Sequence, residues 1–200
     1  MLLKRCIDIA LRFLVLMLLS PILIAVVLAV RLCSGSPILF RQERIGLRFR
    51  RFYILKFRTM RVASGPSVTV AGDDRITRDG RFLRRTKLEE LPRFGNVLRG
   101  DMSLVGPRPE IPEYVDLLRE PYRTVLTVRP GITDLASIHF RNEEEVLSRT
   151  AEPLREYAER VLPAKLDLAE ENIRTHTVLG DISILFRTAA SIVRGDWCSN

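Results

Sequence analysis

Cysteine and histidine are scarce in this 200-residue sequence, which has three cysteines and two histidines. Cys6, Cys33 and Cys198 are odd in number, widely spaced and part of no Cys-x-x-Cys pair, so neither a disulfide framework nor a zinc site is predicted. His139 and His176 are too far apart in the sequence to indicate a metal site. This pattern excludes the small disulfide-rich secreted proteins and fits a reducing cytoplasm.

Charge is absent from residues 13–30, which are almost wholly apolar. As one straight helix this run would be roughly 27 Å long at about 1.5 Å per residue, close to the roughly 30 Å of a hydrocarbon core. Pro21 lies in the middle of the run, where it removes a backbone hydrogen bond and is expected to kink or break a helix. Lys and Arg flank the run on both sides, and basic flanks favour the cytoplasmic face.

Length and charge leave two arrangements of this run open. One is a kinked single-pass anchor. The other is a re-entrant helix that enters the membrane, breaks at Ser20-Pro21 and returns, with Ser20 placed to bond a carbonyl that the proline frees. A cleaved signal peptide is disfavoured, because Arg31 follows the run directly and no small-x-small cleavage site ends it.

The net charge of +8 is unevenly distributed. Lys and Arg are in excess in residues 37–110, directly after the apolar run, whereas residues 111–200 are net acidic. This favours an anionic partner beside a membrane, either lipid headgroups or a phosphorylated substrate. Nucleic acid is not predicted, because zinc-finger, helix-turn-helix and RNP-like patterns are missing. We expect a membrane element in residues 1–36 and one cytoplasmic domain with its own core in residues 37–200.

Two adjacent carboxylates, Glu89 and Glu90, lie among basic residues between two short predicted helices. One interpretation is structural, because Thr86 to Glu89 matches a capping box. Pro92 argues against it, since a helix that starts at Thr86 would have this proline in its interior. A start nearer Glu89 places both carboxylates at a helix N-terminus, which also attracts phosphate. A functional acid pair and a pair of solvated surface acids both remain open.

Further candidate cations lie in a strand and in a loop. Residues 51–58 are rich in β-formers and are predicted to form a strand with Lys56 and Arg58 on one face. Two prolines fix the backbone on either side of Arg108, which could hold a phosphate or be a solvated charge in a connector. Residues 179–193 predict an amphipathic helix whose apolar stripe is more often core than bilayer contact.

Six ordered motifs resemble the monotopic phosphoglycosyl transferases, the bacterial sugar transferase family. They are Phe40-x-Gln42-x-Arg44-x-Gly46, Lys56-Phe57-Arg58-Thr59-Met60, Glu89-Glu90-Leu91-Pro92, Asn96-Val97-Leu98-Arg99-Gly100-Asp101-Met102-Ser103, Val105-Gly106-Pro107-Arg108-Pro109 and Arg129-Pro130-Gly131-Ile132-Thr133. The resemblance implies a re-entrant helix broken at Ser20-Pro21, on the inner face of the bacterial plasma membrane. The expected fold class is therefore α/β, a small, mostly helical cytoplasmic domain with a short β element and an N-terminal re-entrant membrane helix.

The resemblance also implies an activity. Members of the family move a sugar phosphate from a UDP-sugar to polyprenyl (undecaprenyl) phosphate and release UMP, with Mg²⁺ required, as the first membrane step of glycoconjugate assembly. A carboxylate attacks the β-phosphorus of the donor and carries the sugar phosphate covalently. By position, Glu89 is the nucleophile, Glu90 the Mg²⁺ ligand and Arg108 a phosphate clamp. The further phosphate-binding cations are Lys56, Arg58 and Arg85.

One departure from the family falls on the nucleophile. The usual pair is Asp-Glu, whereas this chain has Glu89-Glu90, so the attacking carboxylate is one methylene further out. A displacement of about 1 Å can lower a rate on the order of a hundredfold. Glu89 is then a competent nucleophile in a site that fits it, a slow one, or part of a membrane scaffold that binds the substrates without turnover. A membrane-tethered basic module for an acidic partner is an alternative of another class.

Overall fold

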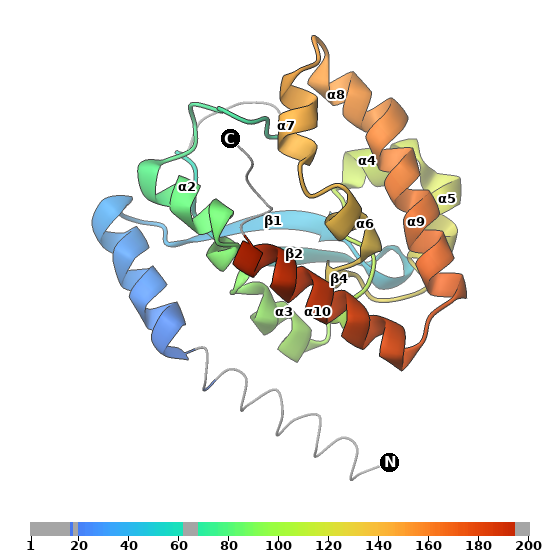
Figure 1. Ribbon diagram of the computed structural model, residues 1–200, viewed down its shortest axis with the longest axis horizontal. Coiled ribbons are helices and arrows are strands. Elements are labelled where there is room, and N and C mark those ends of the chain that lie inside the picture. Colours follow the sequence, from blue (N-terminus) through green and yellow to red (C-terminus); the bar gives the residue numbers. More distant parts are fainter. Residues whose placement is uncertain (1–16, 18–19, 62–67, 195–200) are drawn as a thin grey trace.

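The structure, a computed structural model, describes residues 17, 20–61 and 68–194. The β1–β2 ribbon runs through the middle, with α2 towards one end, α4, α5 and α9 towards the other, and α3 below the ribbon in this view (Figure 1). Its elements after a helix over residues 20–33 are β1 (Leu39–Ile45), η1 (Leu47–Phe49), β2 (Arg51–Phe57), α2 (Arg78–Arg85), η2 (Leu88–Glu90), α3 (Arg93–Arg99), β3 (Ser103–Val105), α4 (Pro112–Leu117), α5 (Arg119–Val125), β4 (Gly131–Thr133), α6 (Leu135–His139), α7 (Glu143–Ser148), α8 (Pro153–Glu156), η3 (Tyr157–Val161), α9 (Leu162–Arg174) and α10 (Val178–Arg194).

The described chain is mostly helical with short β elements, as the sequence predicts, but their arrangement in two small sheets was not predicted. Strands β1 and β2 pair antiparallel, in a register that runs from Leu39 opposite Phe57 to Ile45 opposite Arg51. The strand predicted over residues 51–58 is thus confirmed as β2, whereas its partner β1 was not predicted. Strands β3 and β4 pair in parallel and bring together two glycine-containing loops that are far apart in the sequence.

Asn96 fixes α3 against the edge of β2 that β1 leaves free. Its side chain is fully buried. Oδ1 accepts a hydrogen bond from Leu55 N at 3.1 Å, and Nδ2 donates to Tyr53 O at 2.8 Å. The amide therefore satisfies strand groups that would otherwise be buried without partners. Because α3 follows the Glu89-Glu90 pair directly, this contact also sets the position of that pair relative to β2.

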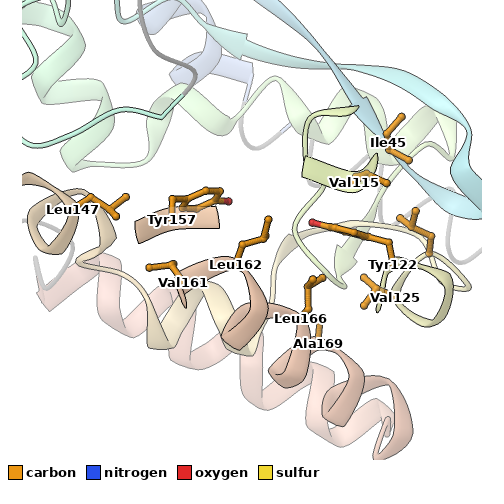
Figure 2. Close-up of a cluster of buried hydrophobic side chains, with 11 residues drawn as sticks. Ile45, Val115, Tyr122, Val125, Leu147, Tyr157, Val161, Leu162, Leu166 and Ala169 are labelled. Atoms are coloured by element: carbon orange, nitrogen blue, oxygen red, sulfur yellow. The ribbon is translucent and has the colours of Figure 1, made fainter. Parts of the chain in front are cut away.

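The largest cluster of buried apolar side chains joins β1 to α4, α5, α7 and α9. Figure 2 shows Ile45 and Val115 on one side of this cluster, and Leu162 and Leu166 of α9 facing Tyr122 of α5. Ile45 belongs to the same strand that pairs with β2. The cluster thus ties the helices at one end of the molecule to the ribbon that carries Lys56.

The helix of residues 20–33 packs on the domain through Val26 and Val30, which contact Phe57 and Leu83. The hydroxyl of Ser20 donates to Met17 O at 2.8 Å, the carbonyl four residues before Pro21. The prediction that Ser20 bonds a carbonyl freed by the proline is confirmed. The first part of the predicted membrane run, residues 13–16 and 18–19, lies outside the described residues.

Within residues 17, 20–61 and 68–194, no helix is long and apolar enough to cross a membrane.

Three local predictions need correction. Thr86 is the C-cap of α2, where its hydroxyl donates to Phe82 O, so the capping box is wrong. Glu89 and Glu90 lie on the one-turn 3-10 helix η2, one turn before α3, which begins only after Pro92. Pro92 does exclude a helix that starts at Thr86, as predicted. The two carboxylates nevertheless precede α3, because the left-handed Lys87 first turns the chain into η2.

The apolar stripe of α10 is the third correction. Ile184 is buried, yet Leu179, Ile182 and Phe186 are exposed, with Leu179 exposed to 80%. A periodic apolar face predicts burial only where another element covers it. Within the described residues nothing covers most of this stripe, so it is surface rather than core.

Candidate active site

Glu89 is a buried acid on the turn between α2 and α3. Lys87 adopts a left-handed conformation (φ 56°) that turns the chain into η2. The Glu89 side chain is buried, and its Oε2 accepts a hydrogen bond from Thr59 Oγ1 at 3.1 Å. A buried charge requires such partners. Lys56 and Arg84 add favourable charge interactions with this carboxylate.

Thr59 is itself held by the start of α2. Its carbonyl oxygen accepts hydrogen bonds from Thr77 N at 3.0 Å and Thr77 Oγ1 at 3.2 Å. Thr77 Oγ1 also accepts from Gly80 N and so caps α2. A Cβ on Gly80 would lie 2.1 Å from Thr59 O, so this approach requires glycine. The hydroxyl that contacts Glu89 is thus placed by a rigid helix start.

Glu90 pairs with Arg93 one turn further along. Arg93 Nη1 lies 3.2 Å from Glu90 Oε2, and Arg93 is only 1% exposed. Burial raises the pKa of Glu90, but the charges of Arg93, Lys56 and Lys87 outweigh it and hold that pKa well below its usual range. Glu90 is therefore ionised at neutral pH. Among the described residues, Arg93 Nε has no hydrogen-bond partner. The ion pair with Glu90 is therefore the main compensation for burying this guanidinium.

Lys56 comes to the acid pair from β2. Burial, together with the positive charge of Arg93, lowers the pKa of Lys56 to about 7, although Glu89 and Glu90 oppose the shift. Its ammonium is consequently a cation that releases its proton near neutral pH. The strand face that was predicted to carry Lys56 does face the acid pair.

Arg108 is fixed by two loops that cross at glycines. A Cβ on Gly131 would lie 2.2 Å from Gly106 N, so neither loop could approach the other with a larger residue there. The Arg108 backbone N–H donates to Asp134 Oδ2 at 3.3 Å, and Gly131 N donates to Pro107 O at 2.9 Å. Burial lowers the pKa of Arg108, but neighbouring carboxylates, Glu90 first, outweigh it and raise the pKa. Arg108 is therefore a permanent, rigidly mounted cation beside Glu90.

A buried network lies behind Arg108. Glu110 Oε1 pairs with Arg44 Nη1 at 2.6 Å, and Glu110 Oε2 accepts from the Tyr157 hydroxyl at 2.8 Å. Burial raises the pKa of Glu110, but Arg44, Lys165 and the tyrosine hydrogen bond hold it below its usual range. This acid links β1, the Arg108 loop and η3.

Glu89 and Arg108 line two neighbouring cavities. One, of about 450 Å³, opens over the β1–β2 ribbon and also contains Lys56, Arg58 and Thr59. The other, of about 180 Å³, extends towards α6 and α9. Residues common to both are Arg84, Glu89, Arg108, Glu110, Glu143 and Glu144. The buried carboxylate of Glu89 thus lies at a cavity that several cations also line. This environment suits an anionic, phosphate-bearing ligand.

The remaining predicted cations are placed differently. Arg58 lines the larger cavity, but its guanidinium donates to the carbonyls of Ser34 and Ser36 at the end of the N-terminal helix. Arg85 is exposed and lines neither cavity; the adjacent Arg84 does, and it pairs with Glu144 at 2.5 Å.

The sequence reasoning did not assign roles to Thr59, Arg84, Arg93 or Glu110. Thr59 stands inside the Lys56 to Met60 motif, which could have drawn attention to it. Arg93 carries the weaker signal of a charge directly after the proline that starts a helix. Neither signal indicates which acidic residue Thr59 or Arg93 contacts.

Glu90 is the residue that the family resemblance assigns to Mg²⁺. Within the described part of the chain, no three His, Cys, Asp or Glu side chains cluster as a complete metal site. Mg²⁺ is commonly held by one or two carboxylates together with water and substrate phosphates. The ionised Glu90 fits that donor set, provided that a phosphorylated substrate completes it.

The chain belongs to the bacterial sugar transferase family, because the model of that family matches residues 1–195. It is 40% identical over 194 residues to the UDP-glucose:undecaprenyl-phosphate glucose-1-phosphate transferase of Escherichia coli strain K12, covering 94% of this chain and 39% of that protein. The protein of the same name from Caulobacter vibrioides is 41% identical over 200 residues, which cover 96% of this chain and 70% of that protein.

A third relative is named for another sugar. The UDP-N-acetylgalactosamine-undecaprenyl-phosphate N-acetylgalactosaminephosphotransferase of Aeromonas hydrophila is 41% identical over 143 residues, covering 68% of this chain and 33% of that protein. The chain thus spans about two fifths of the Escherichia coli relative and a third of the Aeromonas relative. The family predicted from the six motifs is confirmed.

Proposed function

We propose that this chain is a phosphoglycosyl transferase that moves a sugar phosphate from a UDP-sugar to polyprenyl phosphate and releases UMP. The observation that carries the proposal is Glu89, a buried carboxylate that opens onto a cavity edged by Lys56, Arg84 and Arg108. The names of the relatives supply the substrate classes. Such a cavity offers both a nucleophile and fixed positive charge for a diphosphate.

In the proposed reaction a Glu89 oxygen attacks the β-phosphorus of the UDP-sugar. The bond from that phosphorus to the bridging oxygen breaks, and UMP leaves with the electron pair. Glu89 then carries the sugar phosphate as an acyl phosphate. An oxygen of polyprenyl phosphate attacks the same phosphorus, the bond to Glu89 breaks, and the carboxylate is restored beside polyprenyl diphosphosugar. No net proton transfer is needed, because polyprenyl phosphate attacks as a dianion and UMP leaves as one.

The surrounding residues have distinct tasks in this scheme. Thr59 donates to one Glu89 oxygen and leaves the other free to attack. Arg108, fixed by its loop, binds the phosphates, and Lys56 adds charge from the strand. Glu90 would hold Mg²⁺, which when bound neutralises phosphate charge. Arg58 adds its charge at the rim of the cavity.

A second candidate function rests on the replacement of the family's usual Asp by Glu89. In that case the chain is a scaffold that binds the UDP-sugar or polyprenyl phosphate without turnover. It predicts Mg²⁺-dependent binding of UDP-sugar and no UMP release. The contact between Glu89 and Thr59 favours the enzyme, because it gives the longer side chain a defined partner.

The decisive assay is UMP release by the purified protein in nanodiscs with Mg²⁺, undecaprenyl phosphate and a panel that includes UDP-glucose and UDP-N-acetylgalactosamine. Glu89→Gln and Glu90→Gln are expected to lose activity, and Glu89→Asp tests the shorter nucleophile. UMP from one donor, lost in both Gln variants, supports the transferase. If the wild type releases no UMP and Glu89→Asp does, the result supports the scaffold.

The membrane association belongs to the same proposal. The N-terminal helix is re-entrant, broken at Ser20-Pro21, and the domain of residues 37–200 lies on the cytoplasmic face of the bacterial plasma membrane. Lys4→Cys can be compared with native Cys33 in a Cys6→Ser, Cys198→Ser background by labelling inverted vesicles with an impermeant maleimide. A re-entrant helix gives labelling of both cysteines from the cytoplasmic side, and a single-pass anchor gives labelling of one.

A further inference from the structure

A third cavity, of about 260 Å³, adjoins the acid pair and differs from the other two in chemistry. Glu90 and Arg108 line it, but Glu89 does not. Its walls come from η2, α3, β3, β4 and α10. The apolar side chains that form most of the wall are Leu91, Phe94, Leu104, Ile132, Leu185 and Ala189. We call this cavity the apolar groove.

The charged residues of the apolar groove are close to one another, because Lys87 and Arg108 both interact with Glu90. The rest of the lining is apolar apart from the hydroxyls of Thr86, Thr133, Ser137 and Thr188. One pair of these, Thr133 Oγ1 and Thr188 Oγ1, is 2.7 Å apart and ties α10 to β4. Such a groove suits a ligand with an anionic head and an apolar chain.

The groove also opens near apolar surface. Leu104 and Leu185 at its rim are 41% and 37% exposed. Leu91 belongs at the same time to the side chains that pack beneath the helix of residues 20–33. In Figure 1, α10 runs beside α3, and both helices line the groove. Leu91 thus connects the apolar wall to the helix that we propose to sit in the membrane.

The geometry of the two-step transfer explains why the polar cavities and the apolar groove meet at Arg108. Displacement at phosphorus is in line, so the second nucleophile attacks from the side that UMP left. The phosphates of the two substrates must therefore occupy the same place in turn. The uridine of the donor and the lipid chain of the acceptor can occupy different places. Arg108 lines all three cavities and marks the shared place.

We propose that the apolar groove binds the isoprenoid units next to the phosphate of the acceptor lipid, while the polar cavities bind the donor. The inference rests on the proposed transferase function and extends it. It assigns α10, and Leu185 and Ala189 in particular, to acceptor recognition. The head group then lies at Arg108, and the chain leaves past Leu104 towards the bilayer.

Filling the groove tests the assignment, because the two half-reactions can be measured apart. Ala189→Trp and Leu185→Trp place an indole in the groove, and Leu179→Trp, on the exposed surface of the same helix, is the matched control. Without acceptor, both groove variants should release the same stoichiometric burst of UMP as the wild type. With undecaprenyl phosphate, their kcat/KM for the acceptor should fall roughly tenfold or more, which corresponds to about 1.4 kcal/mol or more of lost binding, because the indole occupies the space of the isoprenoid chain. The control should match the wild type in both assays.

Direct binding separates failure of the groove from failure of the transferase. Tritiated farnesyl phosphate should bind the wild type and the Leu179→Trp variant, and bind both groove variants at least about tenfold more weakly. If the wild type releases no UMP but shows this binding pattern, the groove stands and the transferase fails. Unchanged acceptor kinetics and binding in both groove variants overturn the groove, as does equal competition by phosphatidic acid, which would indicate a site for any lipid chain.

Discussion

The hydrogen bond from Thr59 to Glu89 makes the sharpest prediction about the site. Thr59→Val keeps the branched shape of the side chain and removes the hydroxyl that lies 3.1 Å from Glu89 Oε2. Both residues are buried, so water cannot replace the donor freely. A hydrogen bond to a charged group contributes about 1.5–3 kcal/mol. Since Lys56 and Arg84 still compensate the carboxylate, we take the lower half of that range.

Such a loss corresponds to a fall of roughly 10- to 40-fold in the rate of UMP release, because each 1.36 kcal/mol changes a rate tenfold. A misdirected nucleophile slows the chemical step, so kcat should fall while KM for the UDP-sugar changes little. Thr59→Ser keeps the donor and should recover most of the rate. Thermal unfolding of both variants shows whether they fold. A folded Thr59→Val protein with a kcat within twofold of the wild type would refute the positioning role.

Arg93→Met should raise the pKa of Glu90, so the acid limb of the pH–rate profile moves to higher pH; an unmoved limb contradicts the ion pair's role. The same change should lower the free energy of unfolding by about 3–5 kcal/mol, because it leaves a buried charge with one partner fewer. Gly131→Ala should lower the melting temperature and the activity together, whereas Gly95→Ala, whose Cβ would meet nothing closer than 3.9 Å, should do neither. Lys56 has a pKa of about 7 against 10.5 unfolded, so the unfolded chain binds more protons between these values and stability rises with pH. Unfolding of wild type and Lys56→Met at pH 7 and pH 9 should show that rise diminished in the variant.

Local patterns predicted the local structure well. The β-formers of residues 51–58 marked β2, and Pro92 excluded a helix that starts at Thr86. The bond from Ser20 to Met17 followed from the hydrogen bond that Pro21 removes. Each of these depends on residues within one helical turn or one strand, which is why the sequence alone suffices.

Contacts between distant residues were not predictable in the same way. Thr59 and Glu89 are 30 positions apart and meet only because Gly80 lets α2 approach the strand end. Nothing in the sequence distinguishes Arg84 from Arg85, yet one residue rotates a helix position by about 100°, and packing decides which arginine faces the cavity. The buried Arg93 is a similar case, since a charged residue is usually exposed.

The most direct test of the central claim is a single turnover without acceptor. Wild-type protein with Mg²⁺ and its UDP-sugar should release one UMP per active site and gain the mass of one sugar phosphate. Peptide mapping should find the adduct on Glu89, labile to hydroxylamine as an acyl phosphate is, and Glu89→Gln should show neither UMP nor adduct. UMP release that begins only when polyprenyl phosphate is added, or an adduct on a different residue, would contradict the assignment of Glu89 as the nucleophile.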